Sequence, residues 1–224
     1  MNEEEFEECL AIPTFDGFMT RAMEIMGMDQ ERFAGTLPSI IEIVLEMEEK
    51  DPVLMYESVI EAIRGIWTAT TSLPVHGAWH HFLVPGIIVK SLQNNGYGFS
   101  DEDVREAIHR GMMIPGGGCG FHGVCGAGTG AGIAVSVVLG SNPLHDENRS
   151  RALETSAEAY TRISKLGGPR CCPLSTYTSI RVVVRILADL GYELPMSKLG
   201  GRCPYSEINA DCHRERCPYY PRGH

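Results

Sequence analysis

Residues 114–136 read IPGGGCGFHGVCGAGTGAGIAVS and contain nine glycines, two cysteines and one histidine. The second half of this stretch is apolar and predicts a helix over about residues 126–139. Each glycine inside a helix costs about 1 kcal/mol relative to alanine. We therefore expect another backbone, or a bulky ligand, to come very close to this helix, whose first turn carries thiols.

Two common interpretations of a glycine-rich loop fail here. The stretch lacks the Gly-Lys-Ser/Thr ending of a P-loop. A GxGxxG pattern can be drawn through Gly118, Gly120 and Gly123. A dinucleotide site would need a preceding strand, whereas the preceding residues AIHRGMM predict a helix. A phosphate-binding loop is therefore not expected.

The cysteines indicate metal or thiol chemistry more than disulfides. The N-terminal residues MNEEEFEECLAIP are acidic and lack the basic and then apolar pattern of an export signal, so we expect a cytoplasmic protein. In that reducing compartment, clustered cysteines are more often metal ligands or catalytic thiols. The chain has eight cysteines.

Composition excludes several classes of partner. The 224 residues carry a formal net charge of −10, which disfavours binding to nucleic acid or to an anionic membrane. No apolar run reaches the roughly 18 residues of a membrane span. A small-molecule substrate is the expected partner, and a homodimer is the default assembly.

Hydrophobic periodicity predicts an all-α fold: a single helical domain over residues 1–194, followed by an irregular cysteine-rich tail over residues 195–224. Asp51 is the expected N-cap of a helix opened by Pro52, and Ser100 with Asp103 resembles a capping box. The expected helices cover residues 15–27, 37–50, 51–67, 72–96, 100–113, 126–139, 145–168 and 173–192.

The first candidate site is the pair Cys119 and Cys125 around His122. A helix N-terminus stabilises a nearby thiolate, so Cys125 is a candidate metal ligand or nucleophile. The alternative is tight helix packing with two buried cysteines.

The second candidate site is GGPRCCPLSTY, residues 167–177. Adjacent cysteines rarely bridge each other because the bond is strained. Cys171 and Cys172 are therefore expected to face different partners, with one ligating a cluster and the other acting as a thiol. Arg170 could hold a substrate carboxylate. The alternative is one structural and one incidental cysteine.

The tail holds Cys203, Cys212 and Cys217 in the spacing C-x8-C-x4-C, with His213 and His224 nearby. This spacing matches neither a zinc ribbon nor a ferredoxin. Three cysteines so close together nevertheless predict metal binding, with a fourth ligand that is either local or one of the adjacent cysteines.

The histidines of VHGAWHHFLVP form a further cluster. His76 and His80 lie four residues apart, which in a helix places both side chains on one face, as in helical metal sites. His81 points elsewhere. Neutral histidines are candidate acids or bases near pH 7, and the alternative is that they are satisfied core or surface residues.

Three motifs together carry a family resemblance: HHFLVP (residues 80–85), the glycine-rich stretch and GGPRCC (residues 167–172). From about residue 73 onward the chain resembles a Cys/His-rich domain family of unknown function from anaerobic archaea and bacteria. CGAGTGAGIA also resembles the Cys-Gly-Ala-x-x-Gly helix of redox-active proteins. More loosely, two successive cysteine-bearing helices are similar to iron–sulfur serine dehydratases and cysteine desulfidases. These resemblances imply an iron–sulfur cluster, in the first instance 4Fe-4S.

The leading hypothesis is an iron–sulfur enzyme that removes or transfers sulfur, or catalyses an elimination, on a small anionic or sulfur-containing substrate. His80, His81 and His122 would move protons, and Arg170 would hold the substrate. The expected ligands are Cys119, Cys125, Cys171, Cys172, Cys203, Cys212 and Cys217. The alternatives are a zinc-stabilised binding module and a thiol–disulfide redox protein, although no C-x-x-C motif supports the latter.

Overall fold

The computed structural model describes residues 30–66, 75–198 and 203–221. These residues form eight α-helices and one short 3-10 helix without any strand, which confirms the all-α prediction. Within the same residues, no helix combines the length and apolarity needed to cross a bilayer. The elements are α3 (Gln30–Glu46), α4 (Pro52–Ile66), α5 (Trp79–Asn94), α6 (Asp101–Met112), α7 (Gly118–Phe121), α8 (Gly126–Val138), α9 (Asp146–Leu166), α10 (Cys172–Asp189) and η1 (Arg214–Arg216).

The expected helix caps are confirmed. The Asp51 carboxylate accepts the backbone N–H groups of Val53, at 2.8 Å, and Leu54, at 3.3 Å, so α4 begins where its sequence indicates. Ser100 and Asp103 form the reciprocal capping box at the start of α6, each accepting a backbone N–H of the other. These two boundaries follow from local sequence alone.

Two helix starts differ from the prediction. Helix α3 begins well before Pro38, which lies inside it. Helix α5 begins at Trp79, because the Trp79 ring folds back over Gly77 and occupies the space of a residue-77 side chain. His76 therefore precedes the helix, and the prediction that it shares a helix face with His80 is wrong. The helix expected at residues 15–27 lies outside the described residues, as does His224.

Helix α8 packs closely between α5 and α9, as its glycines predict. A methyl group on Gly130 would meet the His81 carbonyl and the Pro85 ring of α5. A methyl group on Gly132 would meet the Ser156 side chain of α9. The close neighbours of these two glycines are residues of other helices. This packing explains why α8 contains glycine although glycine destabilises a helix.

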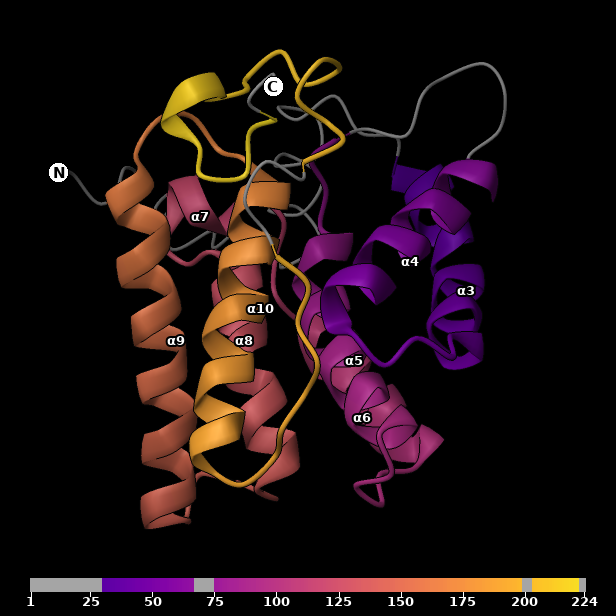
Figure 1. The fold of residues 1–224 in the computed structure, drawn as a ribbon, viewed down its shortest axis with the longest axis vertical. Helices are drawn as coiled ribbons and strands as arrows, with labels where there is room; N and C mark the ends of the chain where they lie inside the picture. Colours follow the sequence, from indigo (N-terminus) through magenta and orange to yellow (C-terminus); the bar gives the residue numbers. More distant parts are fainter. Residues whose placement is uncertain (1–29, 67–74, 199–202, 222–224) are drawn as a thin grey trace, which may run out of the picture.

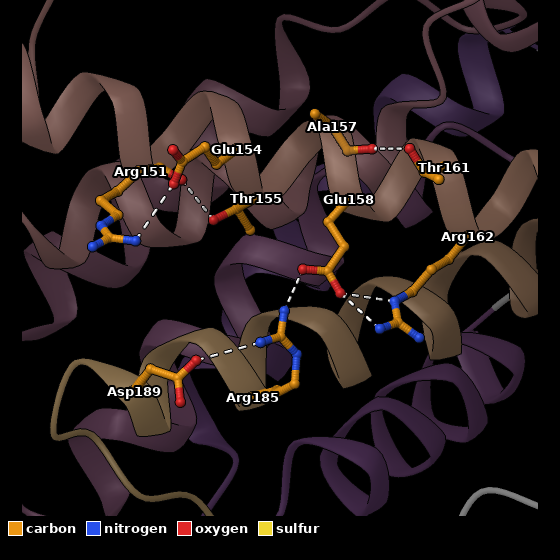
Figure 2. Close-up of polar contacts among 9 residues, drawn as sticks. All are labelled: Arg151, Glu154, Thr155, Ala157, Glu158, Thr161, Arg162, Arg185 and Asp189. Atoms are coloured by element: carbon orange, nitrogen blue, oxygen red, sulfur yellow. Dashed lines mark hydrogen bonds and ion pairs between the residues drawn. The ribbon is translucent and has the colours of Figure 1, made fainter.

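Charged side chains join α9 to α10 on the surface, as Figure 2 shows. Glu158 pairs with Arg162 in its own helix, at 2.8 Å, and with Arg185 across the interface. Arg185 also reaches Asp189, at 3.3 Å. Exposed pairs of this kind each contribute at most about 1 kcal/mol, so this network orients the two helices more than it stabilises them.

The chain after α10 covers the end of the bundle at which α10 begins, close to α7 (Figure 1). The hydroxyl groups of Tyr219 and Thr178 lie 3.0 Å apart, and the Asn209 amide oxygen lies 3.0 Å from His76 Nε2. Tyr219 is buried within the same core as the helices. The described part of the tail, residues 195–198 and 203–221, is irregular apart from η1, as expected, and it is packed onto the helical bundle.

Candidate functional site

A cavity of about 480 Å³ lies at this end of the bundle. Its size is typical of a pocket for a small molecule. Helices α5, α7, α8, α9 and α10, the loop before α10 and the tail all contribute to its wall. The predicted site residues that line it are His80, His81, Cys119, Cys125, Arg170, Cys171 and Cys172.

Four thiols line this cavity, and three of them come from three separate helices or helix starts. Cys119 belongs to α7, Cys125 is the N-cap of α8, and Cys172 is the first residue of α10. Burial raises the pKa of Cys119, and it raises the pKa of Cys172 to about 12, with a further contribution from Cys125 and Cys119. Without a metal, the Cys119 and Cys172 thiols are therefore protonated at neutral pH.

His81 is suited to act as a base or ligand. Its Nδ1 lies 3.1 Å from the Ile114 carbonyl, which can only accept, so Nδ1 carries the proton and Nε2 a lone pair. Within the described ranges, Nε2 has no hydrogen-bond partner. Burial lowers the pKa of His81, which keeps the ring neutral.

His80 does not fit the proton-transfer role expected from the sequence. Its Nε2 lies 3.2 Å from the Val75 carbonyl, and its Nδ1 lies 3.0 Å from the Thr176 hydroxyl. Burial lowers the pKa of His80 to about 3. Both ring nitrogens are thus committed to protein partners, and His80 serves as a buried structural link between α5 and α10. His122 is exposed and lies outside the cavity lining.

Arg170 lies at the exposed edge of the cavity. Its positive charge is close enough to Cys119 to oppose the rise in the pKa of that thiol. Among the described residues, its guanidinium forms no ion pair. This position fits the anion-holding role predicted for Arg170, since a guanidinium that lacks a carboxylate partner is available to a ligand.

The tail thiols line a second and much smaller cavity, of about 10 Å³. Cys203, Cys212 and Cys217 meet Cys171 there. Cys171, Leu174 and His213 line both cavities and so form the wall between them.

The potential metal ligands lie around the same cavities, but their side chains are not positioned for coordination. Across residues 30–66, 75–198 and 203–221, no three histidine, cysteine or acidic side chains form a ready-made ligand set. All seven of the described cysteines are free thiols. A metal entering either cavity would have to draw the thiols together.

The comparisons with known proteins assign the chain to a family. A model described as a family of unknown function, DUF5714, matches residues 40–220. The chain belongs to this family. No curated protein and no solved structure matches the chain. The DUF5714 match includes every cysteine that lines either cavity, and it confirms the resemblance to a domain family of unknown function.

Two features of this DUF5714 chain escaped the sequence analysis. Tyr160 of α9 lines the large cavity, and its hydroxyl lies 2.6 Å from that of Thr129. The cavity-facing residues of α9 follow helical spacing, which could have indicated this face: Tyr160, Ile163 and Ser164. The tail also contains Cys-Pro-Tyr twice, at residues 203–205 and 217–219. This short repeat was visible in the sequence.

Proposed function

We propose that the large cavity holds a thiolate-ligated metal centre, in the first instance an iron–sulfur cluster, and binds a small anionic ligand beside it. The ligands would be Cys119, Cys125 and Cys172. One observation carries the proposal: thiols from three separate elements line one cavity together with a guanidinium that has no carboxylate partner among the described residues.

The donor set suits this group. Soft thiolates select iron–sulfur clusters and zinc over harder ions such as magnesium. Three protein thiolates would leave one iron without a protein ligand, and that iron would supply a Lewis acid next to the bound anion. The metal must displace the protons from Cys119 and Cys172, so loading depends on pH.

The surrounding residues favour an acid–base reaction on a small carboxylate. Arg170 would hold the anion at the cavity edge, and the Nε2 lone pair of His81 could accept a proton. Elimination, sulfur removal and sulfur transfer all need an anion-binding cation and a base. We propose this group of reactions, in line with the resemblance to iron–sulfur dehydratases and desulfidases.

The test is metal analysis of protein purified without oxygen, with iron, zinc and acid-labile sulfide measured together. Iron and sulfide in similar amounts, lost in Cys125→Ser and in Cys119→Ser, would support the cluster. Ser164→Ala is the control, because Ser164 lines the same cavity without offering a thiol. Zinc in place of iron would overturn the cluster. A metal-free protein with a thiol pair that cycles between oxidation states would overturn the whole proposal.

A further inference from the structure

The proposed function uses Cys119, Cys125 and Cys172, and it gives no role to the four thiols that line the small cavity. Cys171 comes from the start of α10, and Cys203, Cys212 and Cys217 come from the tail. Cys217 is buried, and the other three are partly buried. None forms a disulfide. Packing alone does not call for four thiols around a space this small.

Two of the four sulfurs accept a hydrogen bond from a nearby backbone amide. The N–H of Arg214 lies 3.4 Å from Cys212 Sγ, and the N–H of Tyr219 lies 3.4 Å from Cys217 Sγ. Such donors stabilise a thiolate more than a thiol, and hydrogen bonds to sulfur tune thiolate metal sites.

The duplicated Cys-Pro-Tyr sequence brings two of these sulfurs to the small cavity. In the second copy the N–H of Tyr219 donates to Cys217 Sγ. Both tyrosines, Tyr205 and Tyr219, are buried. The backbone N–H of Cys203 donates to the Tyr219 carbonyl at 2.9 Å, which holds the two turns together. The repeat is thus a pair of turns that present thiols to one cavity.

The adjacent cysteines differ in the cavities that they line. Cys172 lines the large cavity only, and its backbone N–H donates to His76 Nδ1 at 3.3 Å. Cys171 lines both cavities and meets the three tail thiols in the small one. The Asn209 amide also donates to Cys171 Sγ, at 3.6 Å.

We infer that Cys171, Cys203, Cys212 and Cys217 bind a Zn²⁺ ion in a closed structural site, separate from the large cavity. Zinc is favoured because structural zinc sites are tetrahedral and often take four thiolates. The cavity of about 10 Å³ accommodates about one water-sized group, which suits a single ion better than a cluster. Four thiolates complete a tetrahedral site without His213, whose Nε2 donates to the Pro169 carbonyl at 2.7 Å.

The chain offers a matched pair of variants for the test, Cys171→Ser and Cys172→Ser. We expect about one zinc per chain in protein produced with added zinc. Cys171→Ser should lose this zinc and expose Cys212 to alkylation. Cys172→Ser should keep the zinc, whatever it does to iron in the large cavity. His213→Gln should also keep it, which separates a four-thiolate site from a site with one histidine.

The inference is overturned if Cys171→Ser keeps a full equivalent of zinc, or if zinc-supplemented wild-type protein holds none. Loss of zinc from Cys172→Ser would overturn the separation of the two sites. If Cys171→Ser fails to fold, replacing zinc by Co²⁺ in Cys172→Ser gives the same decision, because that variant lacks one of the three proposed ligands of the large cavity. A visible spectrum of tetrahedral thiolate coordination supports the site, and an octahedral spectrum refutes it. The iron content tests only the proposed metal centre in the large cavity, and the zinc content of these variants tests only the small cavity. A failure of one proposal can therefore be told from a failure of the other.

Discussion

The imidazole ring of His81 fills the space that a side chain on Gly126 would occupy. Gly126 is the first residue of α8, and Cys125 before it lines the large cavity. The absence of a side chain at residue 126 therefore lets α5 bring the His81 ring against the start of α8, at the cavity that Cys125 also lines. A packing requirement between two helices thus also sets the geometry of the candidate site.

Replacing Gly126 by alanine should destabilise the protein by about 2 kcal/mol, because the new methyl group and the His81 ring cannot share this space. Urea unfolding measures the change. Gly65→Ala is the control, since Gly65 also lies in a helix but has open space around it. That variant should be stabilised by up to about 1 kcal/mol. Equal effects at the two positions would contradict the packing argument.

Arg170→Gln should weaken the binding of a small dicarboxylate such as succinate by about tenfold. The reason is that a charged hydrogen bond to a carboxylate contributes about 1.5 kcal/mol or more. Isothermal titration calorimetry on the metal-loaded protein gives both affinities. Arg105→Gln removes the same charge from an exposed position on α6 and should leave the affinity unchanged. A similar loss in both variants would assign the effect to net charge.

Stability should fall in mild acid because of His80. Its pKa is about 3 in the folded protein and about 6.5 in an unfolded chain. The unfolded state therefore binds the proton first. The contribution of His80 to the free energy of unfolding is fully present well above pH 6.5. It falls by about 1.4 kcal/mol per pH unit between pH 6.5 and about pH 3.

Urea unfolding at pH 7, 6 and 5 tests this contribution. His80→Gln keeps a polar side chain that does not titrate, so its stability should fall less steeply than that of the wild type over this range. Other groups, including His76 and His81, add the same background slope to both proteins. Parallel curves for the two proteins would show that His80 is not the group responsible.

Asp51→Ala should cost about 2 kcal/mol and also loosen the tail. Asp51 caps α4, and its second carboxylate oxygen accepts the backbone N–H of Ser197 at 2.6 Å. Ser100→Ala removes a comparable cap that has no contact with the tail among the described residues. Limited proteolysis should cut Asp51→Ala sooner in the tail than Ser100→Ala. Equal cleavage would mean that the contact with Ser197 does not hold the tail.

Features set by local chemistry were predictable from the sequence. The caps at Asp51 and Ser100 depend on a few neighbouring residues, and the glycines of α8 required close contact whatever the partner. The start of α5 was not predictable in this way. It depends on how the Trp79 ring packs against Gly77, and helical spacing contains no information about that contact.

The sequence also could not predict which cysteines line which cavity. Cys171 and Cys172 are neighbours, and their spacing to other cysteines does not say which partner each one meets. The answer depends on the return of the tail to the start of α10, where Asn209 contacts His76 and Tyr219 contacts Thr178. Those contacts join residues far apart in the chain, so only the folded protein reveals them.

The wall shared by Cys171, Leu174 and His213 has a consequence for biosynthesis. His213 comes from the segment after α10, so a ribosome that has completed the helices has not yet supplied the full lining of the large cavity. At that moment the three proposed ligands of the large cavity, Cys119, Cys125 and Cys172, have been synthesised, and only His213 is missing from the lining. The tail therefore supplies the last part of the wall after the ligands are in place.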